Sequence, residues 1–89
     1  MEVSKRTIWK FNLTKQSSSH EVPIGSKLVH VGKDANGVPA VWLEVSPASP
    51  TEKRYFSVIG TGHSVPDGYD HVGTYLAEPF VWHIYERTV

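Results

Sequence analysis

The chain has 89 residues, of which 39% are hydrophobic and 20% charged, and nine lysines and arginines balance nine aspartates and glutamates. This length predicts one small domain over residues 1–89, and the zero net charge argues against nucleic-acid polymers or anionic lipid as partners. Since the chain has no cysteine, disulfides, thiolate metal sites and a cysteine nucleophile are excluded.

Hydropathy and cysteine usage bear on localisation. The first six residues lack the apolar core of a secretory signal, and no window of 18 apolar residues occurs that could cross a membrane. A chain without cysteine also suits a reducing compartment. We therefore expect a cytoplasmic protein without a membrane partner.

The first quarter of the chain predicts one strand and one short edge segment. Residues 7–13 alternate between apolar or aromatic and polar side chains, which is typical of a half-buried strand. Residues 14–19 are polar and serine-rich and predict a loop. Residues 20–23 predict a short extended segment, which Pro23 would confine to a sheet edge. Residues 24–26 then predict a turn.

The middle of the chain predicts a β-hairpin. Residues 27–32 and 40–45 both alternate as strands do, and Asn36-Gly37 lies between them. Both of these residues tolerate positive φ, which makes the pair a strong hairpin signal. Residues 46–51 contain two prolines and predict a surface loop.

The last part of the chain predicts three more strands, over residues 53–59, 71–76 and 79–86. Gly73 inside the second of them predicts a bulge or a close backbone approach. No segment shows a sustained apolar period of 3.6 residues, so we expect little or no helix. The fold class is therefore all-β, a small antiparallel sandwich or barrel of six to seven short strands.

The loop after residue 59 concentrates glycine, hydroxyl and histidine side chains and predicts a ligand site. Glycines let backbone N–H groups converge on an anion, while the Thr61 and Ser64 hydroxyls and the His63 imidazole add donors. The alternative is a purely structural turn, and the sequence lacks the Gly-Lys-Ser/Thr ending of a P-loop. The predicted ligand-binding residues are Gly60, Thr61, Gly62, His63, Ser64, Tyr69 as a stacking face and His71 as a second anchor.

The same loop also raises the questions of catalysis and of metal binding. His63 and His71 have the chemistry of a general acid and base, but no Ser-His-Asp order accompanies them. Together with Asp67 and Asp70 they have metal-ligating side chains at a spacing that matches no established motif. We expect no catalytic residue, no metal and no cofactor, with a minor enzymatic role as the alternative.

The remaining histidines and the adjacent basic residues Lys53 and Arg54 are predicted to have structural roles rather than a role in a site. His30 and His83 fall within predicted strands and are expected to be hydrogen-bonded at a sheet face, while His20 is expected to be solvated. Lys53 and Arg54 are expected on a solvated face, with phosphate pairing as the alternative.

Trp42 is predicted to contact an oligomer partner. On its strand it lies on the face opposite Val41, Leu43 and Val45, so both faces of the strand carry large apolar groups. A small core and uncovered sheet edges favour association as well. We therefore expect a homo-oligomer.

Four motifs, read together, resemble a known group. They are I-W-K-F at residues 8–11, V-P-I-G-S-K-L-V-H-V at 22–31, G-T-G-H at 60–63 and F-V-W-H at 80–83. The chain resembles a family of small uncharacterised proteins encoded by phages and prophages. This resemblance implies a phage accessory protein acting in the cytoplasm of the host bacterium, and short proteins of that kind often inhibit host defence.

The expected function is non-catalytic binding and sequestration of a small nucleotide-derived signal. Sequestration needs only affinity and copy number, which a short chain can supply. One alternative is a protein–protein inhibitor of a host defence protein, acting through a sheet edge or an aromatic patch. A less favoured alternative is a small phosphodiesterase-like enzyme.

Overall fold

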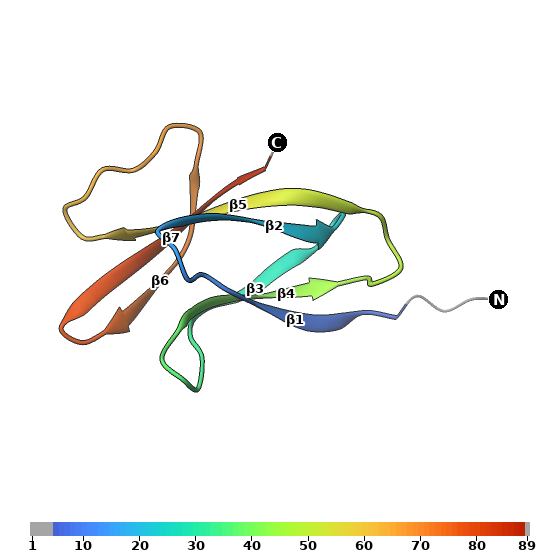
Figure 1. The fold of residues 1–89 in the computed structure, drawn as a ribbon, viewed down its shortest axis with the longest axis horizontal. Helices are drawn as coiled ribbons and strands as arrows, with labels where there is room; N and C mark the ends of the chain where they lie inside the picture. Colours follow the sequence, from blue (N-terminus) through green and yellow to red (C-terminus); the bar gives the residue numbers. More distant parts are fainter. Residues whose placement is uncertain (1–4, 89) are drawn as a thin grey trace.

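A computed structural model describes residues 5–88; residues 1–4 and 89, which the predicted domain includes, lie outside the described part. The described chain contains no helix, and hence none that could cross a membrane. This confirms the all-β prediction. Its seven strands, labelled in Figure 1, are β1 (Thr7–Asn12), β2 (Ser17–Pro23), β3 (Lys27–Lys33), β4 (Pro39–Val45), β5 (Thr51–Gly60), β6 (Asp70–Ala77) and β7 (Phe80–Thr88).

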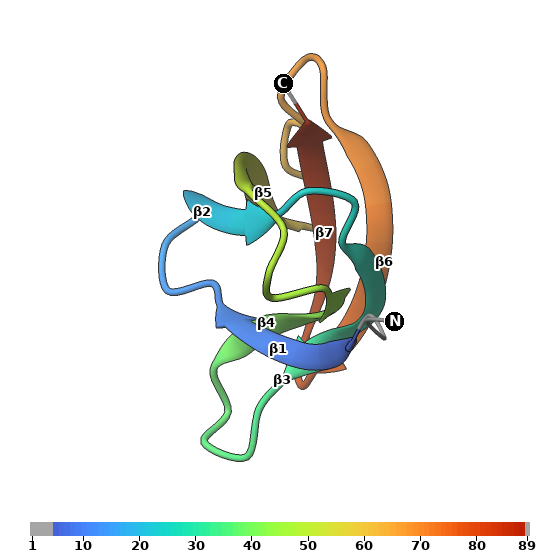
Figure 2. The ribbon, with the colours of Figure 1, turned by 90° about the vertical axis from the view of Figure 1, so that its right-hand side faces the viewer.

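The strands form two antiparallel sheets. One has three strands in the order β1-β4-β3 and the other has four in the order β2-β5-β7-β6. Along one side of the molecule β3 packs against β6, as Figure 2 shows. Gly73 lies at this contact, because a Cβ placed on it would overlap a methyl carbon of Val31. The β6–β7 register also shifts between His71 and Gly73, so both the bulge and the close approach are confirmed.

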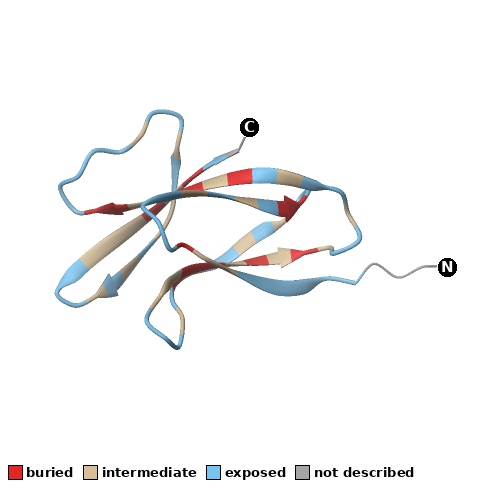
Figure 3. Ribbon diagram, viewed as in Figure 1, coloured by how far each residue is buried: buried red, intermediate tan, exposed pale blue. Residues whose placement is uncertain are grey.

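The core lies between the two sheets, and β4 contributes three of its residues. The alternation along β4 buries Val41, Leu43 and Val45 almost completely, as predicted. Phe56 of β5 and Ile84 of β7 face them from the other sheet. In Figure 3 most of the buried positions fall on β2, β4, β5 and β7, whereas β1 is exposed over most of its length.

The serine-rich segment is only partly a loop, which corrects the prediction for residues 14–19. Residues 17–19 belong to β2, which pairs with β5 and forms an edge of its sheet, with Pro23 at its end as predicted. The Ser17 and Ser57 hydroxyl oxygens lie 2.8 Å apart. Because these polar groups satisfy each other, a hydrophilic segment is tolerated in the strand.

The predicted hairpin joins β3 and β4, and Asp34 organises its turn. Gly37 adopts a φ of 80°, whereas Asn36 does not have positive φ. Only one of the two residues therefore adopts the positive φ on which the hairpin prediction was based. The Asp34 carboxylate accepts bonds from the backbone N–H groups of Asn36 and Val38. Together with donation from Asn12 and Lys10, the Val38 bond holds the pKa of Asp34 well below its ordinary value.

Arg54 is buried, which corrects its predicted place on a solvated face. Its guanidinium donates from Nε and Nη2 to the Glu86 carboxylate on β7, and its Nη1 donates to the Ser26 carbonyl at 2.6 Å. Both side chains are about nine-tenths buried. Arg54 therefore links the sheet to the β2–β3 turn and is occupied by protein groups.

His20 is also less solvated than predicted. Its ring lies between Phe11 and Phe56, with ring centroids 5.6 and 6.0 Å away. Its Nε2 lies 3.1 Å from the Ser18 hydroxyl oxygen. Partial burial lowers the pKa of His20.

Candidate functional site

A cleft of about 690 Å³ opens between the two sheets near the end of β5. Its volume lies in the range of roughly 300 to 1,000 Å³ that is usual for sites of small ligands. Its walls come from the β1–β2 connection, the β3–β4 hairpin, β5, β6, β7 and the loop after β5. The lining residues are Leu13, Thr14, Lys15, Gln16, Gly37, Val38, Pro39, Val58, His63, Tyr75, Ala77 and Trp82.

The glycine-rich turn places His63 at this cleft. The His63 backbone N–H donates to the Gly60 carbonyl at 3.0 Å, and Gly62 between them has a φ of 91°. Gly60 pairs with Trp82 of β7. A Cβ on Gly60 would lie 3.1 Å from both His63 Nδ1 and Trp82 Cζ3. The bare glycine backbone thus leaves room for both the imidazole and the indole beside the end of β5.

Trp82 and Tyr75 form the aromatic wall of the cleft. They are opposite each other on β7 and β6. The hydroxyl oxygen of Tyr75 is buried and has no hydrogen-bond partner among the described residues, and burial raises the pKa of this phenol. A buried hydroxyl without a partner costs about 1–3 kcal/mol, so its presence beside a cleft calls for an explanation.

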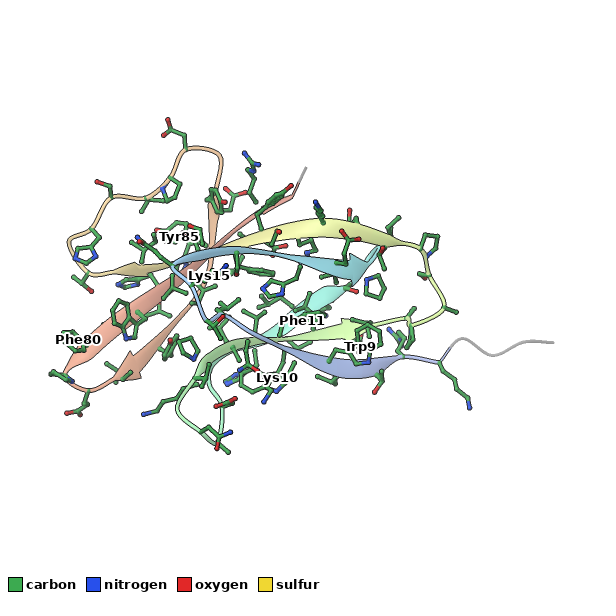
Figure 4. All side chains as sticks on the ribbon, in the orientation of Figure 1. Trp9, Lys10, Phe11, Lys15, Phe80 and Tyr85 are labelled. Carbon is green, nitrogen blue, oxygen red and sulfur yellow. The ribbon has the colours of Figure 1, made fainter. Side chains whose placement is uncertain are left out.

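The rim of the cleft is more polar than its walls. Thr14, Lys15 and Gln16 form the connection from β1 to β2 and are all exposed. Figure 4 labels Lys15, which lies in this connection. The cleft therefore combines apolar and aromatic walls, one imidazole and a lysine at its edge.

Thr61 and His71 lie on another face, where a chain of hydrogen bonds joins them through β6 and β7. Thr61 Oγ1 lies 2.9 Å from His83 Nε2, and His83 Nδ1 lies 3.0 Å from Thr74 Oγ1. Thr74 Oγ1 in turn lies 2.8 Å from His71 Nε2. His83 is therefore hydrogen-bonded at a sheet face, as predicted.

Tyr69 lies beside Arg87, whose guanidinium carbon is 4.9 Å from the Tyr55 ring centroid and 5.8 Å from that of Tyr69. Tyr69 and Tyr55 line a second hollow of about 480 Å³ together with residues of β2. Ser64 is exposed and lines neither hollow. Of the predicted residues, the structure thus brings His63 to the cleft, with Gly60 and Gly62 in the turn that carries it. Thr61, Ser64, Tyr69 and His71 lie outside the cleft.

Two further predicted features concern Trp42 and metals. Trp42 is half-buried, and its ring lies 5.1 Å from that of His30 on the outer face of the three-stranded sheet. Within residues 5–88 no group of three or more histidine, aspartate or glutamate side chains is arranged to hold a metal ion.

Comparison with known families gives one match, a domain of unknown function designated DUF7352, over residues 4–89. The chain belongs to this family. No curated protein and no solved structure matches it. This agrees with the expectation of an uncharacterised family. The match names no activity, so the function of this DUF7352 domain has to be argued from its cleft.

Sequence reasoning missed most of the cleft residues of this DUF7352 domain. Trp82 and Tyr75 were predicted as core aromatic residues, because strand alternation does not reveal where two sheets separate. Lys15 was predicted as part of a polar loop. One signal was available, since the F-V-W-H motif that contains Trp82 was singled out together with the G-T-G-H turn. These two motifs meet at the Gly60–Trp82 pair.

Proposed function

We propose that this DUF7352 domain is a non-catalytic binding protein that holds a small nucleotide-like ligand in the cleft between its sheets. The observation that carries the proposal is the cleft itself, which both His63 and Trp82 line beside Gly60. A ligand with a flat ring and an anionic group matches this combination of side chains.

The aromatic wall favours the ring of such a ligand. An indole face stacks on any nucleobase, and stacking of one base on an aromatic side chain contributes about 1–3 kcal/mol. Trp82 is only half-buried, so part of its surface is free for such a contact. Val58, which is half-buried, adds apolar surface beside it.

The polar groups favour the anion. The His63 imidazole donates a hydrogen bond when neutral and adds a positive charge when protonated. Lys15 at the rim supplies an ammonium group for a phosphate. The buried Tyr75 hydroxyl gives the same wall an unused donor, which a small movement of the wall would make available.

The biological setting belongs to the proposal as well. We propose that the protein is a phage accessory protein in the bacterial cytoplasm and that the ligand is a nucleotide-derived defence signal. Binding without turnover removes free signal in proportion to affinity and copy number.

The proposal is tested by titrating ¹⁵N-labelled protein with nucleoside 5′-monophosphates and cyclic dinucleotides, followed by amide chemical shifts. We expect shifts in residues 13–16, 37–39, 60–63 and 75–82. Trp82→Leu and His63→Gln should weaken binding at least about tenfold, which corresponds to ~1.4 kcal/mol. The matched controls Trp42→Leu and His71→Gln alter the same residue types outside the cleft and should leave binding unchanged.

Other outcomes of this titration contradict the proposal. Shifts confined to the His71–His83 face would place the site elsewhere. A ligand converted to a cleaved product during the titration would identify an enzyme. Equal loss of binding in Trp82→Leu and Trp42→Leu would show that the variants act through the fold.

A protein–protein inhibitor is the second candidate function, and one observation favours it. Leu76 and Phe80 at the end of the β6–β7 hairpin are 67% and 57% exposed, and Figure 4 shows Phe80 at that far end. Exposed apolar groups at one place are typical of interaction surfaces. Replacing both by serine should abolish inhibition of a host protein and leave nucleotide binding intact.

A further inference from the structure

The two sheets have four edge strands, and three of these edges are obstructed. The β2 strand ends at Pro23, which has no N–H to donate. The β3 strand carries a register shift between Leu28 and His30, and β6 carries the one before Gly73. These two strands also pack against each other. Prolines, bulges and covering elements are the usual means by which edge strands avoid further pairing.

The remaining edge, β1, has none of these protections. Its six residues pair with β4 in one unbroken register, from Thr7 opposite Val45 to Asn12 opposite Ala40. No other described strand runs alongside it. The backbone groups on its outer side are therefore available for another strand.

The side chains of β1 are suited to a contact as well. Ile8 is 49% exposed and Trp9 is 38% exposed. The one lysine of the strand, Lys10, has its ammonium group 3.0 Å from the Asp34 carboxylate. An edge lysine deters pairing through its free charge. The ion pair with Asp34 weakens this deterrent without removing it, because the Lys10 side chain stays 41% exposed. Figure 4 shows Trp9 and Lys10 along this strand.

We propose that two copies of the chain pair antiparallel through β1, which joins their three-stranded sheets into one sheet of six strands. The inference is independent of the ligand proposed for the cleft. An antiparallel pair of identical strands is self-complementary, as a two-fold interface requires.

Charge selects the register of this pair. With the two-fold axis at Trp9, the two indoles face each other and Ile8 lies opposite Lys10 of the second copy. An axis at Ile8 would set Lys10 opposite Arg6, and an axis at Lys10 would set two lysines opposite each other. Like charges directly opposite destabilise a strand pair, whereas aromatic pairs stabilise it. Axes at Thr7 or Phe11 would pair at most three residues of each β1 strand, whereas an axis at Trp9 pairs residues 7–11. The axis therefore lies at Trp9.

The dimer is expected to depend on concentration, because one strand contributes a small interface. Sedimentation velocity of the full chain over a wide concentration range should show a monomer–dimer equilibrium. A chain that sediments as a monomer at every concentration up to its solubility limit would overturn the proposal.

Two variants at Ile8 test the register by charge alone. Ile8→Lys sets two lysines opposite each other at two symmetric places and should weaken the dimer at least about tenfold. Ile8→Glu sets a glutamate opposite Lys10 and should preserve or strengthen it. Within one chain Ile8 faces Glu44, so the lysine variant should have the more stable monomer. Equal dimerisation of the two variants would place the interface elsewhere.

A cysteine variant tests the axis directly, since the natural chain has no cysteine. Residues directly opposite each other have Cβ atoms roughly 4.5–5.5 Å apart, close to the span of a disulfide. Trp9→Cys should therefore form a covalent dimer on mild oxidation. Ile24→Cys is the control, because Ile24 is 53% exposed in a turn away from β1. Equal cross-linking of the two variants would contradict the proposed axis.

Discussion

Replacing Arg54 by methionine tests the buried ion pair that joins β5 to β7. In the native fold the guanidinium makes two bonds to Glu86 and one to the Ser26 carbonyl. The methionine variant leaves the Glu86 carboxylate, whose side chain is 8% exposed, without its cation, and leaves the carbonyl without its donor. Breaking a buried pair in this way costs about 3–5 kcal/mol.

This loss is large for so small a domain. Total stabilities of about 5–15 kcal/mol are usual, so the variant would lose a substantial part of the free energy of unfolding. Since 1 kcal/mol shifts the Tm of a domain of this size by about 4–8 °C, the midpoint should fall by about 12 °C or more. Urea titration followed by tryptophan fluorescence, together with a thermal scan, measures both quantities.

The double variant Arg54→Met/Glu86→Leu separates the two causes of the loss. It removes both charges and fills their space with apolar groups, which in buried pairs is often neutral or stabilising. We expect it to be more stable than Arg54→Met alone by at least about 2 kcal/mol. The reasoning is refuted if Arg54→Met costs less than about 1 kcal/mol, or if the losses of the two single variants simply add in the double variant.

Three other changes test local features of the fold. Tyr75→Phe removes a buried hydroxyl that has no partner among residues 5–88 and should raise the free energy of unfolding by about 1 kcal/mol in urea titrations; a decrease would show that the hydroxyl is hydrogen-bonded in solution. The lowered pKa of Asp34 means that its carboxylate stabilises the fold above the ordinary value of about 3.9. That stabilisation should fade as the pH falls below about 4, and this fading should be absent in Asp34→Asn, as denaturation at neutral and acidic pH would show. Gly73→Ala places a methyl group against Val31 and should cost about 1–3 kcal/mol; an unchanged unfolding midpoint would mean that β3 and β6 do not pack closely.

The strands were predictable because their signal is local. Alternation along β4 identified Val41, Leu43 and Val45 as core residues before any pairing was known. Gly73 in β6 indicated its bulge for an equally local reason, since glycine within a strand marks an irregular backbone. These features depend on neighbours in the chain, which the sequence shows directly.

The features that escaped prediction depend on residues distant in the chain. Ser17 is stable in a strand because Ser57, forty positions later, bonds to it. Arg54 is buried because Glu86 and Ser26 supply its partners. His20 is partly covered by aromatic residues of two other strands. Burial created by tertiary contacts overrides the hydrophilic character that each residue shows alone.

The sequence predicted only the local part of the candidate site. The glycines and the histidine of the G-T-G-H turn indicated a ligand loop, and the turn does carry His63 to the cleft. Trp82 and Tyr75 could not be assigned, because the cleft exists only where two sheets separate. Thr61 and His71 were grouped with His63 by sequence distance, whereas strand geometry sends them to another face.

Native mass spectrometry of the protein purified from bacteria with nucleotide-signalling defence systems tests the central claim most directly. Wild-type protein and the Trp42→Leu control should retain an intact nucleotide-like mass at a fixed ratio to the chain, and Trp82→Leu should lose it. The same spectra report the number of chains in each species. Wild-type protein that carries no such mass and takes up none from a panel of nucleotides, or equal retention of it by Trp82→Leu, would contradict ligand binding in the cleft.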